Sequence, residues 1–251
     1  MARSMRRLGG SLLSLAGFLV AWKVLTVVTG TPDYILPAPE VVGARALRAI
    51  ASGVLWQHTA VTLSEILLGF AVGAFSAVAV GTALGKSVVV ERVLSPYIVA
   101  AQSVPILALA PLLDIWFGGG LLARVLICAL IVFFPIAIAT MVGIRSADPL
   151  LAEMLRSLGA SRGQLTVRLE LPSALPVIFG GLRVGVTLAV IGAVVAEWAG
   201  ASSGLGVLIN IANQGLFDTP LMFVALVTLA LIGITLHGLV VIAERRLVPN
   251  A

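Results

Sequence analysis

The stretch LLARVLICALIVFFPIAIATMVG, from Leu121 to Gly143, carries a single charged residue, Arg124. A helix needs about 20 consecutive, mostly apolar residues to cross the hydrocarbon core of a bilayer. A helix also satisfies its own backbone polar groups, which the membrane core cannot do. The rest of the chain continues the pattern, since 60% of its 251 residues are hydrophobic and 11% are charged. Soluble domains have about 45–50% apolar residues, so the sequence predicts an all-α integral membrane protein.

Five further apolar runs of similar length flank this one. Together they predict a single transmembrane domain over residues 1–251 with about six membrane-spanning helices, near 8–28, 60–84, 94–117, 121–143, 174–198 and 221–243. The third run contains Pro96, Pro105 and Pro111. Proline is a common cause of sharp bends in helices, so a kinked helix is expected there.

The distribution of Lys and Arg predicts that both termini are cytoplasmic. Cytoplasmic loops of membrane proteins carry an excess of these residues. With the N-terminus inside, eleven of the sixteen fall on the cytoplasmic side: Arg3, Arg6, Arg7, Lys86, Arg92, Arg145, Arg156, Arg162, Arg168, Arg245 and Arg246. They are scattered singly or in pairs, so the net charge of +5 indicates membrane topology and no nucleic-acid partner.

The polar segment before the fifth span, over about residues 148–172, has the signals of two short helices joined by a glycine. Asp148 precedes a proline, which is typical of a helix start, and Gly159 is the preferred residue for the left-handed turn that ends a helix. Ser161 and Gln164 have capping-box spacing and open a second helix, which Pro172 is expected to end. Such a cytoplasmic pair is either a connector packed on its own bundle or a docking element for a soluble partner.

The same segment resembles the EAA loop of ABC importer permeases, usually written EAA-x3-G-x9-I-x-LP. The spacing matches without a gap, and the departures are Met154 and Leu155, where alanines are usual, and Leu169 in place of isoleucine. All three replacements are apolar. The residues assigned to the loop by this resemblance are Glu153, Met154, Leu155, Gly159, Ala160, Ser161, Leu169, Leu171 and Pro172.

The resemblance covers about residues 35–247. The stretches ILPAPEVV, SVPILALAPLLDIWFG, GIRSADPLLAEMLRSLGAS, AEWAGASSGLG and ERRL look like the nitrate, sulfonate and taurine group of these permeases. The stretch GLFDTPLMFVAL, from Gly215 to Leu226, looks more like relatives that import vitamin precursors such as hydroxymethylpyrimidine or riboflavin. The expected solute is therefore a nitrate-, sulfonate- or taurine-like anion, with a vitamin precursor as the alternative.

What the resemblance implies is a permease subunit of an importer in the cell (plasma or inner) membrane, with the EAA-like loop as the element that couples it to ATP hydrolysis. The implied partners are two ABC ATPase subunits, an extracytoplasmic solute-binding protein, the lipid bilayer and a second permease subunit, either the same chain or a close paralogue. ATP hydrolysis is expected on the separate ATPase. No cofactor, metal or catalytic residue is implied for this chain.

Polar residues inside the predicted spans are candidates for the solute pathway, because each is costly in a membrane and usually functional. The candidates are Gln102 and Ser103 with the neighbouring Pro105, Arg183, and Glu197 with the neighbouring Trp198. The first three lie near the middle of the expected kinked helix, and such a helix with polar groups can line a cavity. Glu197 could instead bind an interfacial donor, and Arg183 could extend toward the head groups or face an anionic ligand.

Two other classes of protein remain open. A secondary transporter would show inverted repeats and an ion-coupled acid in mid-membrane, and no convincing repeat is evident. The segment GASSG, Gly200 to Gly204, fits the G-x-S-x-G pattern of serine hydrolases. With His58 or His237 it would make an intramembrane serine protease. The single cysteine, Cys128, excludes an intrachain disulfide and argues against a structural metal site.

Overall fold

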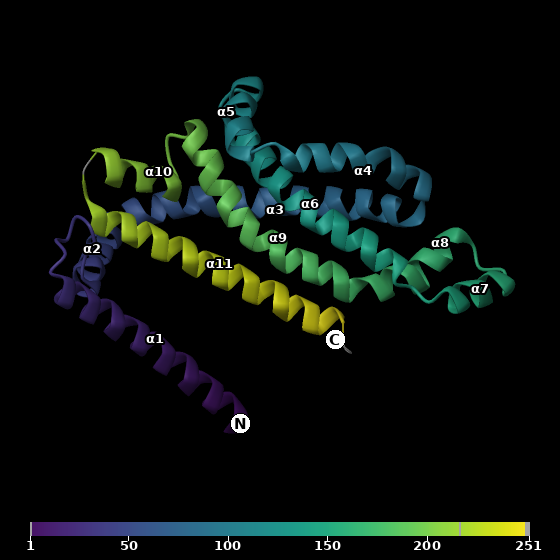
Figure 1. Cartoon of the computed structure of the whole chain (residues 1–251), viewed down its shortest axis with the longest axis horizontal. Coiled ribbons are helices and arrows are strands. Elements are labelled where there is room, and N and C mark those ends of the chain that lie inside the picture. The colour runs from purple at the N-terminus through teal and green to yellow at the C-terminus, as the bar shows by residue number, and fades with distance from the viewer. Residues whose placement is uncertain (1, 216, 249–251) are drawn as a thin grey trace.

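The computed structural model describes the backbone of residues 2–215 and 217–248, and the side chains of residues 13–14, 16–214 and 217–248. These residues form helices and no strand (Figure 1). The elements are α1 (Ala2–Thr29), α2 (Pro39–Ala51), α3 (Val54–Lys86), α4 (Val88–Ser103), α5 (Ile106–Phe117), α6 (Leu121–Arg145), α7 (Pro149–Ser157), α8 (Arg162–Leu165), η1 (Thr166–Glu170), α9 (Leu171–Gly200), α10 (Leu205–Asn210), η2 (Ile211–Gly215) and α11 (Thr219–Leu247), where η marks a π-turn.

Four stretches of helix are long and apolar enough to cross a membrane: Val54–Lys86, Leu121–Arg145, Arg162–Gly200 and Thr219–Leu247. The bent pair α4 and α5 would make a fifth. Six spans were expected. The first of them, near 8–28, falls on α1, where the described apolar helix is the shorter Ala16–Thr29. The side chains of Arg3, Arg6 and Arg7 lie outside the described residues.

Helices α3, α6 and α9 form the packed centre of the fold. Along α3 a small residue recurs at every fourth position and faces α6: Gly69, Gly73, Ala77, Gly81 and Gly85. Small residues at this spacing let two membrane helices approach closely. A Cβ on Gly73 would lie 2.7 Å from the carbonyl oxygen of Ala129, so the approach requires glycine. Cys128 is fully buried in this core, as its apolar surroundings in the sequence indicate.

The expected kinked helix over 94–117 is two separate helices, α4 and α5, which meet at 97°. Pro105 is the cause, since proline excludes the residue before it from the helical region. Val104 accordingly has φ −82° and ψ 123°, and α5 starts afresh after Pro105. A non-helical backbone at membrane depth is tolerated only where it is buried in protein or lines a water-filled cavity.

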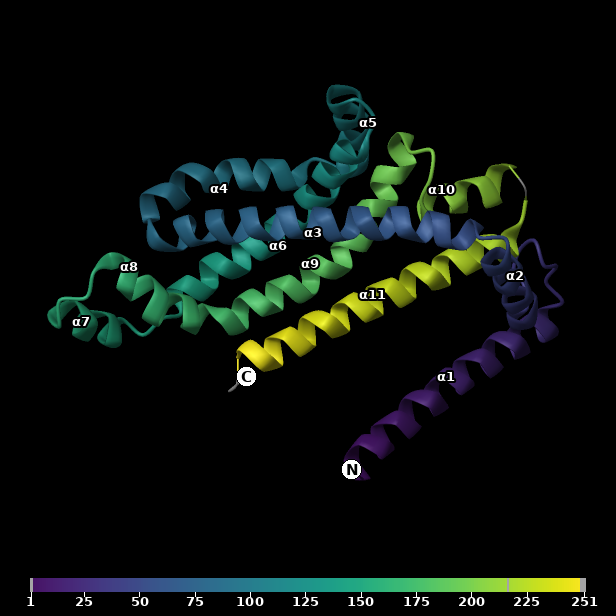
Figure 2. The same cartoon turned by 180° about the vertical axis from the view of Figure 1, so that it is seen from behind.

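The end of the bundle opposite α7 and α8 is built by α2, α10 and the start of α11 (Figures 1 and 2). Residues 201–215, which lie between the fifth and sixth expected spans, fold back as α10 and η2, and Leu205 and Leu208 of α10 are buried against Leu221 of α11. Arg45 of α2 donates from Nε to Asp218 Oδ2 at 2.7 Å. This ion pair fixes α2 over the end of the bundle.

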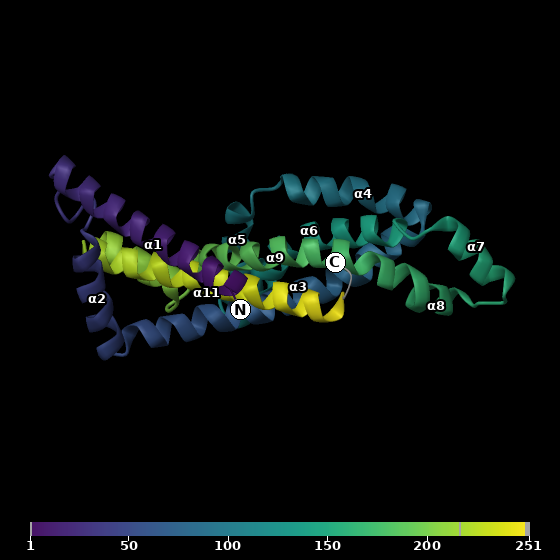
Figure 3. The same cartoon turned by 90° about the horizontal axis from the view of Figure 1, so that it is seen from below.

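Helix α1 lies apart from the central helices along most of its length (Figures 1 and 2), and in the view from below it crosses α11 (Figure 3). Near its end Trp22 stacks on Phe223 of α11, with ring centroids 5.6 Å apart. Lys23 forms an ion pair with Glu40 of α2. The Lys23 ammonium holds the pKa of the Glu40 carboxyl below its usual range. These contacts hold α1 to the bundle at one end.

Candidate functional site

The helix pair α7 and α8, called the coupling pair below, has the caps that the sequence predicted. Asp148 Oδ1 accepts from the backbone N–H of Leu150 at 2.8 Å. Ser161 and Gln164 form a reciprocal capping box at the start of α8. Gly159 has φ +80°. These caps satisfy the free backbone groups at the helix ends, so the pair is locally rigid.

The turn between the two helices has the hydrogen bonds of a Schellman motif. The N–H of Ala160 donates to the carbonyl of Leu155 at 3.0 Å, and the N–H of Gly159 donates to the carbonyl of Arg156 at 2.9 Å. This pattern requires a left-handed residue at the position of Gly159. The prediction of a glycine-centred turn is therefore confirmed in its backbone geometry.

The apolar stripe of α7 is uncovered. None of the nine residues of α7, all of them described, is buried. The stripe consists of Leu150, Leu151, Met154 and the C-cap residue Leu158, of which Leu150 is 73% and Leu158 is 76% exposed, and Leu155 beside them is half-buried. The coupling pair projects from one end of the bundle (Figure 2). A connector packed on its own bundle would bury this stripe, so the geometry favours the docking alternative.

The expectation that Pro172 ends the second helix is wrong. The helix continues from α8 through the π-turn η1 into α9, and Pro172 is in the first turn of α9. In the π-turn the N–H of Leu171 donates to the carbonyl of Thr166, five residues back. The wider turn accommodates a residue that lacks an N–H and would otherwise clash with a carbonyl. The coupling pair is thus joined to a membrane helix without a loop.

Two ion pairs tie this end of the bundle together. Lys86, at the end of α3, lies 3.2 Å from Glu170 of η1 and also donates to the hydroxyl of Thr166. Arg145, at the end of α6, donates to both oxygens of Glu91 of α4, at 3.1 and 2.7 Å. Each pair joins segments far apart in the sequence, so at this end of the bundle α3 is linked to η1 and α6 is linked to α4 by charge.

A cavity of about 300 Å³ lies at the break between α4 and α5. Gln102, Val104, Pro105 and Phe134 are among the residues that line it. Ser103 is exposed beside it, with its hydroxyl bonded to the carbonyl of Val99 at 2.9 Å. The structure therefore brings together three of the pathway candidates, Gln102, Ser103 and Pro105, around a break that leaves polar backbone accessible.

Glu197 and Trp198 are engaged by the chain itself. The Glu197 carboxylate is 2% exposed and accepts from the backbone N–H groups of Gly206 and Val207, at the start of α10. It also accepts from the hydroxyl of Thr62 at 2.5 Å. The indole N–H of Trp198 donates to the carbonyl of Gly206 at 3.0 Å. Glu197 thus caps α10. This arrangement corresponds to the alternative in which Glu197 binds a hydrogen-bond donor instead of lining the solute pathway.

The GASSG segment is the turn that makes this cap possible. Gly204 has φ +135°, and a Cβ there would lie 2.1 Å from the carboxyl carbon of Glu197. His58 Nδ1 lies 2.7 Å from the carbonyl oxygen and 3.0 Å from the backbone nitrogen of Gly204. In the described part of the chain no hydrogen bond joins Ser202 or Ser203 to a histidine. The glycines are explained by packing, and the hydrolase alternative loses its support.

The basic residues within the spans are neutralised. Arg183 of α9 forms an ion pair with Glu244 of α11. Arg124 donates to Glu65, whose side chain is fully buried, at 2.6 Å. The sequence analysis missed Glu65. An acidic residue in one apolar run and a basic residue in another are the signal that indicates an ion pair between two membrane helices.

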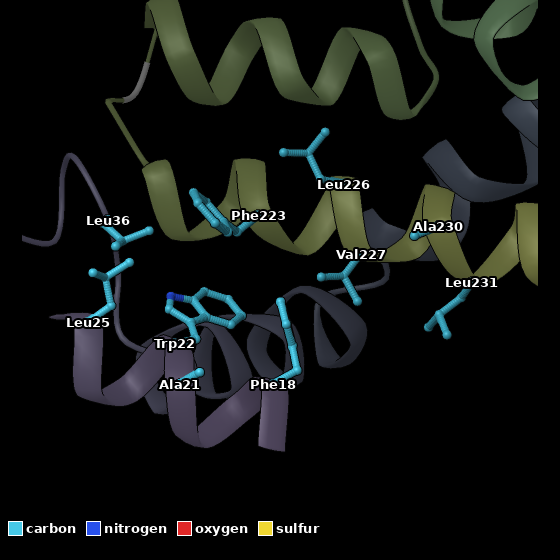
Figure 4. A pocket seen from close by; sticks show the side chains of 10 residues that line it. All are labelled: Phe18, Ala21, Trp22, Leu25, Leu36, Phe223, Leu226, Val227, Ala230 and Leu231. Atoms are coloured by element: carbon cyan, nitrogen blue, oxygen red, sulfur yellow. The ribbon is translucent and has the colours of Figure 1, made fainter. Parts of the chain in front are cut away.

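A groove of about 650 Å³ between α1 and α11 is lined by apolar residues (Figure 4). Phe18 and Trp22 of α1 and Phe223 and Leu231 of α11 border it. It contains none of the pathway candidates. Apolar surface of this kind faces hydrocarbon in a membrane protein, so the groove is no path for a polar solute.

Comparison with known proteins identifies the family. Residues 69–249 match the family described as "Binding-protein-dependent transport system inner membrane component". The chain belongs to this family. It is thus a multi-pass membrane protein and a permease of the ABC importer type.

Several characterised relatives are similar to this permease along most of its length. It is 48% identical to the riboflavin transport system permease protein of Chloroflexus aurantiacus, over 94% of this chain and 88% of that protein. It is 34% identical to the formylaminopyrimidine transport permease protein of Halalkalibacterium halodurans, over 99% and 98%. It is 32% identical to the taurine transport system permease protein of Escherichia coli, over 95% and 88%.

Solved structures have the same fold. An inward-facing methionine ABC transporter chain gives a TM-score of 0.63 at 20% identity, covering 80% of this chain and 97% of that one. An amino acid ABC transporter solved with histidines gives 0.62 at 20% identity, covering 79% and 96%. These similarities support the helical arrangement alone.

Proposed function

We propose that this permease forms the membrane pathway of an importer together with a second permease chain, identical or closely related. Two separate ATPase subunits bind on the cytoplasmic side and supply the energy, so the permease hydrolyses no ATP itself. A solute-binding protein delivers the ligand from outside. Membership of the binding-protein-dependent family supports this assembly.

The uncovered stripe of α7 is the observation that supports the ATPase contact most directly. Four apolar side chains on a doubly capped helix pair project away from the bundle, and α8 continues into α9. A groove on an ATPase would bury the stripe. Movement of that groove would then displace the pair as a rigid body, which is how one subunit can bias the arrangement of another. In this proposal Glu153 and Gly159 belong to the contact.

Replacing Gly159 with valine is expected to uncouple ATP hydrolysis from transport. A β-branched residue held at φ +80° is strained by about 1–3 kcal/mol. No described atom lies within 4 Å of a Cβ added at Gly159, so the effect comes from the backbone and not from a clash. Solute uptake and ATPase rate are measured on the reconstituted transporter. The number of ATP molecules hydrolysed per solute molecule imported should rise.

The matched control is Gly159→Asn, because asparagine tolerates the left-handed conformation. This variant should keep uptake and ATP hydrolysis coupled. Normal coupling in Gly159→Val, or equal loss in both variants, would contradict the role assigned to the turn.

The transported solute is, in our proposal, a neutral heteroaromatic vitamin or vitamin precursor. The intramembrane Arg124 and Arg183 are paired with carboxylates, so neither offers a free positive charge to a sulfonate. The cavity at the α4–α5 break carries no charged side chain among its lining residues. The relatives that transport riboflavin and formylaminopyrimidine agree with this preference, and the taurine relative represents the competing anion.

The chemistry of that cavity suits a flat heterocycle. The Gln102 amide offers both donors and an acceptor, which match the alternating ring nitrogens and carbonyls of a pyrimidine or flavin. Phe134 offers an aromatic surface for stacking. The proposed pathway therefore runs past the break, with Gln102 as the residue that distinguishes heterocycles from apolar molecules.

Replacing Gln102 with leucine is expected to raise the half-saturation concentration for riboflavin or an aminopyrimidine about tenfold. A ligand group left without its hydrogen bond in a desolvated site costs about 1–3 kcal/mol. Gln57→Leu makes the same change at an exposed position on α3 and should have no effect. The measurement is uptake of labelled solute by reconstituted transporter. Uptake of taurine but not of either heterocycle by the unaltered transporter would refute the solute class.

A further inference from the structure

A polar cavity of about 590 Å³ lies between the coupling pair and the ends of α3 and α6. Lys86 of α3, Arg156 of α7, Arg162 of α8 and Glu170 of η1 supply its charged groups. Ile144 of α6 and Leu165 of α8 form apolar parts of the wall. The cavity is distinct from the exposed stripe of α7, which contributes none of its apolar residues to the lining.

The charges of this cavity do not balance. Glu170 forms an ion pair with Lys86 at 3.2 Å, so the charge of that carboxylate is already matched. Arg156 and Arg162 take part in no ion pair within residues whose side chains the structure describes. Three cations and one carboxylate leave an excess of two positive charges. A built cavity with two uncommitted guanidinium groups favours an anion with several oxygens, because guanidinium binds phosphate through two parallel hydrogen bonds.

We propose that this cavity binds the phosphate group of an anionic phospholipid. Helix α3 ends at Lys86 and α6 at Arg145, which places the cavity where two apolar helices leave the hydrocarbon. Basic pockets between membrane helices on the cytoplasmic side bind anionic head groups. The cavity exceeds the size of one phosphate, and Ile144 and Leu165 suit the glycerol and the first methylenes of the chains.

The bound lipid would join segments that belong to different parts of the fold. Arg156 and Arg162 lie on the two helices of the coupling pair, whereas Lys86 ends α3. A phosphate between them replaces mutual repulsion of the three cations by attraction. The lipid therefore fixes the angle between the coupling pair and the bundle, and the anionic lipid content of the membrane affects the rigidity of the pair.

Lipid retention by the full permease tests this proposal. The purified chain is exchanged into equal amounts of phosphatidylglycerol and phosphatidylcholine, passed through size exclusion, and the retained lipids are quantified by mass spectrometry. The unaltered chain should be enriched in phosphatidylglycerol. In the double variant Arg156→Gln, Arg162→Gln the enrichment should fall about thirtyfold, since each of the two basic residues near an anionic surface contributes about 1 kcal/mol.

Arg168→Gln is the control, because Arg168 is exposed on η1 and is not among the residues that line the cavity. It removes one positive charge close to the cavity and should keep the enrichment. Equal enrichment in the double variant and the control would overturn the proposal. So would release of the phosphatidylglycerol by an equal concentration of inorganic phosphate, which would make the site one for free anions. The permease is measured without ATPase subunits, so the outcome is independent of the importer assembly.

A second measurement separates lipid from protein as the occupant. ATPase subunits are added to the double variant and to the control, and co-purification is compared. Unchanged co-purification in the double variant supports the lipid site. Lost co-purification with full phosphatidylglycerol enrichment would assign the two arginines to the protein partner and would overturn the proposal.

Discussion

Substituting aspartate for Leu150 and Met154 is expected to detach the ATPase subunits while the permease itself stays folded. Both side chains are exposed, by 73% and 52%, so neither belongs to the buried core of the permease. Burial of two such side chains in a partner's groove contributes about 3–6 kcal/mol, and two carboxylates would have to lose their water there. Co-purification of the ATPase should weaken by about a hundredfold or more.

Val167→Asp is the matched control for this experiment. Val167 is 67% exposed and lies on η1, outside the stripe. It introduces one carboxylate close to the coupling pair and should leave co-purification unchanged. Retention of the ATPase by the double variant, or equal loss in the control, would contradict the docking role of the α7 stripe.

Replacing Gly81 with valine is expected to prevent α3 and α6 from packing. A Cβ at this position would lie 2.5 Å from the carbonyl oxygen of Ala137 and 2.6 Å from Thr140 Cβ. Backbone cannot move aside as a flexible side chain can. Overpacking of a filled core costs about 1–3 kcal/mol, and this contact should fall at the upper end of that range. The measurement is the thermal unfolding midpoint and the monodisperse fraction in detergent.

Gly238→Val provides the comparison in a membrane helix of the same fold. At Gly238 of α11 no described atom lies within 4 Å of an added Cβ, so valine has room. The two variants share the change in helix propensity and differ only in the contact. Equal unfolding midpoints for the two would show that close approach of α3 and α6 does not limit stability.

The sequence predicted local features of the coupling pair well, because their causes are local. Asp148, Gly159 and the Ser161–Gln164 capping box act over one to three residues, so their spacing is enough to predict the turn. The all-α class and the apolar helices follow equally from composition. The docking role of the pair stays a prediction from spacing, supported by the exposure of α7.

Features that depend on contacts between residues far apart in the chain could not be predicted from the sequence. From the local sequence alone Pro172 is expected to end a helix, but the wider π-turn η1 accommodates it and the helix continues. Glu197 was expected to be a pathway residue or a partner of some donor, and its donors are the amides of α10, which pack there only because residues 201–204 turn back. The pairing of Glu65 with Arg124 joins residues on two different helices.

The continuity of the helix across η1 has a mechanical consequence. With 30 residues, α9 is about 45 Å long at 1.5 Å per residue, so each degree of tilt about one end shifts the other by about 0.8 Å. Glu197, near the far end, holds α10 through two backbone amides. In the proposed assembly, a displacement of α8 by an ATPase subunit would therefore move the opposite end of α9, and α10 with it, without a loop between them.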